Sequence, residues 1–275
     1  MSIDDYLAEN QDYEPPRDEK IDEVKSILLS ELFDANPAQV YYQRQVEILF
    51  ERRFFHWITA KALNELANEG VIGCEERQRD VLRIKFYWSR RNRYWRRRAD
   101  KIEQIVARFS DSSFTYALGR QGELLFDAAL PKAGFMPRGE DVKSYNGLVW
   151  TKTNHNLDRV FVRDGVHYGV EYKNTLSYID RRELEVKLEI CDTLKLVPLF
   201  IMRMAPASYI ELIQVRGGFA LIFEWQLYPF FSEDFAKEVR EELGIKVDSP
   251  RSIAEGTIQR VVKWHENRLL GDDLV

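Results

Sequence analysis

The sequence predicts an α/β protein in which a mostly helical N-terminal part precedes a mixed sheet flanked by helices. Three observations support this fold class. Residues 18–70 carry three apolar stripes with helical spacing. Residues 113–231 alternate between helix-like and strand-like patterns, which is typical of a central sheet with helices packed against it. Residues 232–275 carry two further helical patterns.

These shifts in pattern predict four segments. The chain has 275 residues, enough for one large domain or two ordinary ones. Hydrophobic residues make up 45% and charged residues 31%, so a packed core is expected rather than disorder. We expect a polar tail at 1–17, a helical domain with a connecting helix at 18–112, an α/β domain at 113–231 and a helical extension at 232–275.

Charge and cysteine content exclude several classes of protein. The net charge of −5 argues against a protein that is basic all round, although local basic patches remain compatible with it. Cys74 and Cys191 lie far apart and form no CxxC motif, so neither a structural zinc site nor a disulfide framework is expected. We expect a cytoplasmic protein, because neither a signal peptide nor an apolar run of membrane-spanning length is visible.

The helical N-terminal part resembles a winged-helix domain, in which the third helix and the wing often meet DNA. Pro37 suits the first turn of the second helix and Gly70 is a natural end for the third. The expected elements are helices at 18–33, from Pro37 to Leu49 and at 57–69, strands at 71–73 and 81–88, and a long connecting helix at 92–109.

The expected elements of the α/β part are alternating helices and short strands. They are a helix at 115–130, strands at 147–151, 158–163 and 166–173, a helix at 179–194, strands at 197–202 and 210–215, and an apolar run ending at Trp225.

One predicted β-hairpin carries most of the functional information. Asp164 and Gly165 stand between two β-prone runs, and this pair is a strong signal for a two-residue hairpin turn. Pairing outward from the turn puts Asp158 directly opposite Glu171. Like charges in such a position are destabilising, so a divalent cation between the two carboxylates is expected. The alternative is an exposed, salt-screened acid pair.

Lys173 and Glu123 add two further candidate residues. Lys173 lies two residues after Glu171 and therefore projects from the same face of the strand. Glu123 falls at the edge of an apolar helix face, where an unpaired carboxylate is costly. A metal ion that activates water, beside an ammonium group that orients it, is what phosphodiester hydrolysis needs. The alternatives are an ordinary solvated Glu-x-Lys strand and a partly solvated Glu123.

These segments resemble the PD-(D/E)XK nuclease superfamily, and most of all the archaeal-type Holliday junction resolvases and restriction-endonuclease-like proteins. The resemblance covers about residues 113–205, and Leu157 stands where the family name has proline. The motifs that carry it are Gly119-Arg-Gln-Gly-Glu123, Gly134-Phe135, Leu157-Asp158 and Val170-Glu-Tyr-Lys173.

This resemblance implies a restriction-endonuclease-like fold and a magnesium-dependent endonuclease of DNA, either specific for branched or junction DNA or restriction-like. Its catalytic residues would be Glu123, Asp158, Glu171 and Lys173. The three acids and the backbone carbonyl of Tyr172 would bind one or two Mg²⁺ ions, which Mn²⁺ can replace. Many relatives act as dimers, so a homodimer or a larger complex is compatible with the sequence.

Candidate DNA contacts form an arginine-rich segment at 83–98, which contains no acid and has interleaved aromatic residues. Arginines neutralise phosphates and aromatic rings stack on bases. The alternative is a basic helix face paired with acids, with the aromatics in the core; we expect most aromatics to be buried and most arginines to meet DNA. The candidates are Arg90, Arg91, Arg93, Arg96, Arg97, Arg120, Gln121, Arg181 and Arg182, with Lys187 as an additional contact.

Two other functions remain open from the sequence. The chain could be a catalytically inactive DNA-binding or regulatory protein on a nuclease fold, or a nuclease subunit of a larger defence or transposition complex. No glycine-rich phosphate loop is visible, so an ATP-driven motor is not supported.

Overall fold

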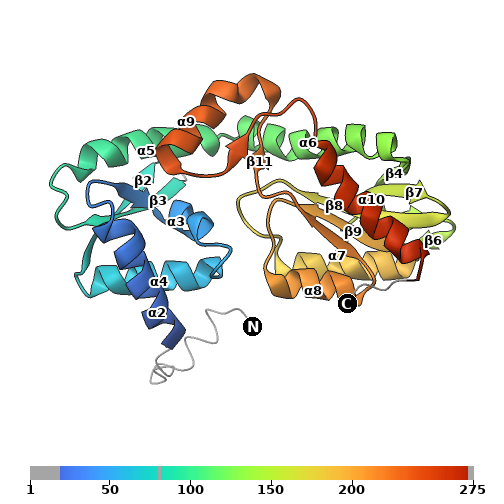
Figure 1. Ribbon diagram of the computed structural model, residues 1–275, viewed down its shortest axis with the longest axis horizontal. Coiled ribbons are helices and arrows are strands. Elements are labelled where there is room, and N and C mark those ends of the chain that lie inside the picture. Colours follow the sequence, from blue (N-terminus) through green and yellow to red (C-terminus); the bar gives the residue numbers. More distant parts are fainter. Residues whose placement is uncertain (1–18, 80–81, 272–275) are drawn as a thin grey trace. The chain divides into compact units, whose positions relative to one another are not determined.

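The computed structural model describes residues 19–79 and 82–271 of the chain (Figure 1). The predicted polar tail at 1–17 lies outside the described residues. The chain divides into two compact units between Gln104 and Ile105, within the long helix α5 (Trp95–Phe109). The four predicted segments stay a prediction. None of the described helices is long and apolar enough to cross a membrane.

The N-terminal unit combines helices with a small antiparallel sheet of order β1-β3-β2. The apolar stripe of its third main helix is buried, and Gly70 follows that helix with a positive φ of 72°. Its elements before α5 are α2 (Glu19–Leu28), the π-helix η1 (Leu29–Asp34), β1 (Val40–Tyr42), α3 (Gln43–Leu49), α4 (His56–Asn68), β2 (Ile72–Arg79) and β3 (Leu82–Ser89).

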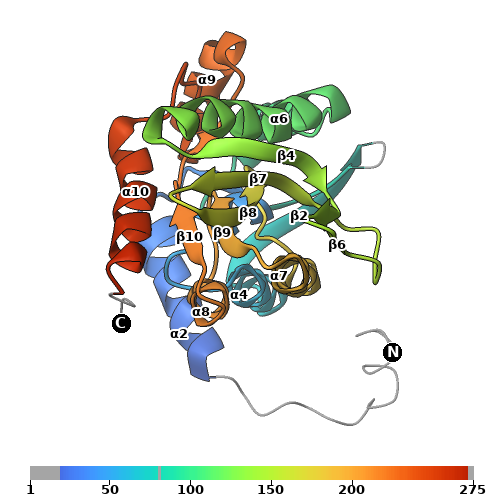
Figure 2. The ribbon, with the colours of Figure 1, turned by 90° about the vertical axis from the view of Figure 1, so that its right-hand side faces the viewer.

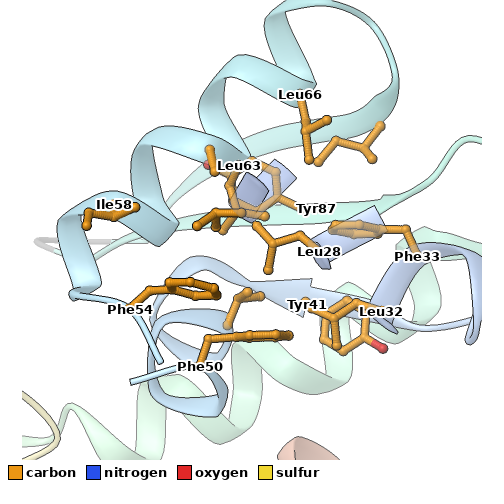
Figure 3. Close-up of a cluster of buried hydrophobic side chains, with 14 of the residues drawn as sticks. Leu28, Leu32, Phe33, Tyr41, Phe50, Phe54, Ile58, Leu63, Leu66 and Tyr87 are labelled. Atoms are coloured by element: carbon orange, nitrogen blue, oxygen red, sulfur yellow. The ribbon is translucent and has the colours of Figure 1, made fainter. Parts of the chain in front are cut away.

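One cluster of apolar side chains holds this unit together (Figure 3). Leu28 from α2 and Leu63 from α4 are fully buried in it beside Tyr87 of the sheet. Phe33 and Tyr41 meet edge to face with ring centroids 5.7 Å apart. Helices α2, α3 and α4 therefore bury their apolar stripes in one shared core, as the helical spacing predicts.

The predicted helix from Pro37 is wrong in its first part. Residues Val40–Tyr42 form β1, which pairs with β3, and α3 begins only at Gln43. β-branched and aromatic residues favour a strand, and all of β1 is buried. Pairing with a strand more than 40 positions away decides the conformation here, and local spacing cannot reveal it.

The C-terminal unit is built on a mixed five-stranded sheet of order β10-β9-β8-β7-β4. β8, β9 and β10 run parallel, whereas β7 is antiparallel to both of its neighbours. The strands and their main helices are α6 (Ser112–Ala129), β4 (Met136–Val142), β7 (Leu157–Arg163), β8 (Val166–Lys173), α7 (Arg181–Leu194), β9 (Val197–Met202), α8 (Ala207–Val215) and β10 (Phe219–Ile222).

Helices cover both faces of this sheet (Figure 2). α6 and α10 (Glu255–Leu269) pack on the face that carries Phe161 and Tyr168. α7 and α8 pack on the opposite face, which carries Val160 and Phe200. The predicted α/β class, with a central mixed sheet flanked by helices, is thereby confirmed.

The remaining C-terminal elements complete the same unit. His265 of α10 is fully buried, and its ring lies 2.9 Å from an Asp164 carboxylate oxygen and 2.5 Å from the Tyr168 hydroxyl. The last helix is therefore joined to the hairpin turn as well as packed on the sheet. The smaller elements are η2 (Pro131–Ala133), β5 (Ser144–Tyr145), β6 (Leu148–Val149), β11 (Gln226–Leu227), η3 (Phe230–Ser232), α9 (Glu233–Leu243) and β12 (Val247–Asp248).

Three predictions about the elements of this unit were wrong. The expected strand at 210–215 belongs to helix α8, which follows Pro206 and buries Ile213 against the α7 side of the sheet. The expected strand at 147–151 is only the two-residue β6, paired with β5. Strand β4 was missed, because its sequence contains proline, glycine and charges, which an edge strand tolerates.

Candidate active site

The hairpin that carries the candidate residues forms with the predicted turn. Asp164 and Gly165 both have positive φ, 49° and 76°, as the turn type favoured in two-residue hairpins requires. The pairing runs from Arg163–Val166 to Arg159–Val170. The register predicted from the Asp-Gly pair is therefore confirmed over these positions.

The ladder stops one step before the predicted Asp158–Glu171 pair, so the expectation of two directly opposed acids is corrected. At this point the Tyr172 backbone N–H donates to the Asp158 carboxylate, with N and O 2.8 Å apart. The side chain of Asp158 thus takes a backbone donor of β8, and the two strands no longer pair residue by residue.

Glu171 is buried with a partner that the sequence did not suggest. Its side chain is 4% exposed, and its carboxylate accepts a hydrogen bond of 2.6 Å from Lys187 Nζ. Burial raises the pKa of Glu171 to about 8; the Asp158 charge adds to the rise and Lys187 opposes it. A metal ion is therefore not required to compensate this acid. The predicted DNA contact at Lys187 is wrong, because that side chain is inside the protein.

Lys173 projects from the same face of β8 as Glu171, as predicted, and both reach α7. Its ammonium lies 3.1 and 3.2 Å from the two carboxylate oxygens of Glu183. Strand β8 and helix α7 therefore face each other with two opposite-charge pairs, Glu171–Lys187 and Lys173–Glu183. The spacing of Glu183 and Lys187, one helical turn apart on a stripe that continues with Ile190, is the sequence feature that could have revealed them.

Asp158 lies within electrostatic range of both lysines. Burial raises the pKa of its carboxyl, while the Tyr172 N–H and then the charges of Lys187, Arg159 and Lys173 lower it. The structure thus brings Asp158, Glu171 and Lys173 to one end of the hairpin. The charge of Asp158 interacts with that of Glu171 and with that of Lys173.

Glu123 approaches this site from α6. It is half-buried, as its position at the edge of the apolar face predicted, and burial raises the pKa of its carboxyl. Arg120 donates to it at 2.7 Å and lowers that pKa, whereas the charge of Asp158 raises it. Arg120, predicted to touch DNA, is therefore bonded to the candidate catalytic acid in this structure.

A second charged network lies between α6 and the hairpin and was missed from the sequence. Arg159 contacts Asp127 at 2.8 Å and Glu140 at 3.0 Å, and it reaches Glu123 at 4.0 Å. The Tyr172 hydroxyl donates to Asp127 at 2.8 Å. Asp127 follows Glu123 by one helical turn, so the repeated acid on one face of α6 was the available sequence feature.

Close packing of α6 on the end of β8 fixes the position of Glu123. A Cβ at Gly122 would lie 2.8 Å from the Asn174 Cβ, so only glycine allows this approach. The Asn174 amide nitrogen donates to the carbonyl oxygens of Leu118 and Leu227, each at 2.7 Å. Asn174, directly after Lys173 in the chain, therefore ties α6 to the end of the hairpin strand.

The acids fit a magnesium site only in part. Within the described ranges, no group of three or more His, Cys, Asp or Glu side chains is close enough to hold a metal ion. Magnesium is usually held by one or two carboxylates together with water and phosphate oxygens. Asp158 and Glu171, whose charges interact in a buried setting, match that smaller donor set. The roles of Glu123 and of the Tyr172 carbonyl as ligands stay predictions.

The predicted DNA contacts divide into two groups. Arg181 is bound to Glu185 at 2.9 Å, Arg182 is exposed at the start of α7, and Gln121 is half-buried on α6. The other group is exposed and has no acidic partner among the described residues. We call it the arginine patch, and it consists of Arg90, Arg91, Arg93, Arg96 and Arg97.

The aromatic residues of the same segment are mostly buried, as expected. Phe86 and Tyr87 are fully buried and Trp95 is 8% exposed. Tyr94 differs from them, because 87% of it is exposed. No family model, curated protein or solved structure matched this chain in the comparisons.

Proposed function

We propose that this protein is a magnesium-dependent endonuclease that hydrolyses phosphodiester bonds of DNA. The observation that carries the proposal is the placement of Asp158, Glu171 and Lys173 at one end of the hairpin, with Glu123 approaching from α6. Two acids and an ammonium group in such a setting supply negative ligands and a positive donor beside each other. This is the combination that hydrolysis of a phosphodiester requires.

In this proposal Asp158 and Glu171 would hold the metal ion. When bound, it would lower the pKa of water and neutralise charge on the phosphate. Lys173 would donate a hydrogen bond to the attacking water and keep it in line with the phosphorus–oxygen bond to be broken. Water would add to phosphorus and lose a proton to the solvent. The bond to the 3′ oxygen would break, that oxygen would take up a proton from the solvent, and a 5′-phosphate and a 3′-hydroxyl would remain.

The ion pairs with α7 then take part in the same proposal. Glu171 would give up its hydrogen bond to Lys187 and bind the metal ion instead. Lys173 would leave Glu183 and donate to the attacking water. Lys187 would remain beside the site and hold positive charge near Asp158, on which its charge already acts. Half-burial of Glu123 next to Arg120 would place a third acid at the edge of the site.

A second candidate function has a specific observation in its favour. Glu171 and Lys173 already have oppositely charged partners at 2.6 and 3.1 Å, which leaves neither group free. A catalytically inactive protein that binds DNA through the arginine patch would keep these pairs closed. The proposal of an enzyme therefore depends on their opening in the presence of magnesium and DNA.

The deciding experiment is cleavage of a DNA panel by the purified protein in magnesium or manganese. The panel would hold a four-way junction, a flap, a linear duplex and a single strand. We expect cleavage of at least one substrate, and a loss of about 100-fold or more in Asp158→Asn and Lys173→Met. Glu189→Gln on the exposed side of α7 is the matched control and should cleave like the wild type.

Two results would reject the enzyme. One is binding of every substrate without cleavage in either metal. The other is cleavage that survives in both Asp158→Asn and Lys173→Met, which would indicate a contaminating nuclease. In the first case the inactive DNA-binding protein becomes the supported function.

A further inference from the structure

An open hollow lies in the N-terminal unit where β2 and β3 meet the turn before α5. It has a volume of about 530 Å³. Gly73 and Cys74 of β2, Trp88 of β3, and Arg90 and Arg93 of the turn are among the residues that line it. None of its lining residues is an acid. An anion is therefore the chemical class of ligand that this hollow favours.

The walls of the hollow are fixed by packing. Trp88 stacks on Trp95 with ring centroids 3.9 Å apart and an angle of 12° between the planes. The Trp88 ring also lies so close to β2 that a Cβ at Gly73 would be 2.3 Å from it. Packed against both Trp95 and Gly73, this ring forms a fixed wall of the hollow.

Hydrogen bonds hold the turn that carries the arginines. The Asn92 amide nitrogen donates to the Ala38 carbonyl at 2.8 Å, and its oxygen accepts from the Tyr94 backbone N–H at 3.0 Å. Arg90 donates to the Gly70 carbonyl at 2.8 Å. A guanidinium bound to a neutral carbonyl keeps its charge uncompensated, and Arg93 has no acidic partner among the described residues. The turn therefore presents positive charge from a fixed backbone.

Tyr94 lies in the sequence between Arg93 and Trp95, which line this hollow, and its side chain is in solvent. It is 87% exposed, whereas the other aromatic residues of the segment are buried or packed against one another. An exposed ring next to arginines is the arrangement with which proteins bind single-stranded nucleic acid, because each unpaired base offers a face for stacking. The bases of a blunt duplex are already stacked and offer no such face.

We propose that this turn binds single-stranded DNA, with a backbone phosphate at Arg90 and Arg93 and an unpaired base stacked on Tyr94. The inference rests on the proposed function only in taking DNA as the ligand. The winged-helix resemblance would instead place helix α4 on duplex DNA. This helix carries a single lysine, Lys61, and one acid, Glu65, so it offers a phosphate backbone little positive charge. The substrate class would be DNA with an unpaired segment, such as a flap or an overhang.

Binding is measured by fluorescence anisotropy in EDTA, so that no cleavage occurs, with a labelled single strand and a blunt duplex of the same sequence. We expect the single strand to bind more tightly. Tyr94→Ala should weaken single-strand binding about tenfold and leave duplex binding nearly unchanged. Tyr116→Ala removes a tyrosine that is 77% exposed on α6 and is the matched control, expected to change neither.

A charge-matched pair of variants tests the phosphate position. Arg93→Gln should weaken single-strand binding more than Arg97→Gln, which removes the same charge outside the hollow. Equal affinity for single strand and duplex would overturn the inference, as would equal losses in Tyr94→Ala and Tyr116→Ala. Failure of the nuclease proposal would instead show as absent cleavage in magnesium, with the Tyr94-dependent preference intact.

Discussion

The charged residues around Glu171 are buried or half-buried and paired with one another, whereas those around Arg93 are exposed to solvent. Glu171 and Lys187 are about 95% buried and face each other, while Lys173 and Glu183 form a second pair beside them. The arginine patch is exposed and has no acidic partner among the described residues. Buried charges must be compensated within the protein, whereas exposed ones can remain available to a polyanion.

The difference shows how a chain of net charge −5 can present a basic surface. Acids elsewhere in the chain form ion pairs with other basic residues, such as Asp127 with Arg159 and Glu31 with Arg53. Among the residues that the structure describes, the arginine patch has no acid in such a pair. The net charge of the chain is therefore a poor guide to either region.

Removing Lys187 should give the largest effect. In Lys187→Met the buried Glu171 loses its partner, and loss of one member of a buried pair costs about 3–5 kcal/mol of unfolding free energy. Arg97→Met in the exposed patch should change stability by less than about 0.5 kcal/mol. Urea unfolding of both variants at pH 8.5 measures the contrast. Equal losses would show that the two regions do not differ in the way described.

Protonation of Glu171 should make the free energy of unfolding depend on pH. Its pKa is raised from 4.5 to about 8, so the folded protein binds this proton more tightly than the unfolded chain. The contribution is fully present below pH 4.5 and is lost as the pH rises through about 8. Glu171→Gln should flatten unfolding free energy over this range, whereas exposed Glu211→Gln should not. An unchanged slope in Glu171→Gln would contradict the raised pKa.

Neutralising the arginine patch should weaken DNA binding without affecting the fold. A variant with all five arginines changed to glutamine should bind duplex DNA about 100-fold more weakly at low salt. The slope of log affinity against log salt concentration should become shallower by about 0.9 for each phosphate interaction removed. Anisotropy titrations between about 50 and 200 mM salt measure this. A fall in melting temperature comparable to that of Lys187→Met would show that the patch has a structural role.

Two glycines of α6 give the smallest predicted effect and test packing rather than charge. Gly122→Ala would push a methyl group against Asn174 and should cost about 1–2 kcal/mol of unfolding free energy. Gly119→Ala meets open space and should stabilise the helix by about 0.5–1 kcal/mol. Thermal unfolding compares them. If both variants are stabilised, α6 is not held against the end of β8 as described.

Local sequence features were sufficient to predict the β7–β8 hairpin. The Asp164-Gly165 pair determines a turn, and the turn determines the register down to Arg159–Val170. The departure at Asp158 could not be predicted in this way, because a side chain there replaces a backbone partner. The burial of Lys187 could not be predicted either, because a lysine on a helix is ordinarily exposed and only the contact with β8 buries this one.

The elements that were predicted wrongly depend on partners that are distant in the sequence. Strand β1 forms because β3 is available to pair with it, and α8 forms because Ile213 is buried against the α7 side of the sheet. Neither partner is visible in local spacing. Strand β4 lies at the edge of the sheet, where only one neighbour constrains it, so its residues carry little alternation.

The bond between His265 and Asp164 has a consequence for the order of events during synthesis. The two residues are 101 positions apart, and α10 supplies part of the cover for the sheet face that carries Tyr168. A ribosome that has released the complete hairpin still has this helix to make. The nascent sheet therefore keeps one face partly uncovered until α10 emerges, and a chaperone that recognises apolar strands has its opportunity in that interval.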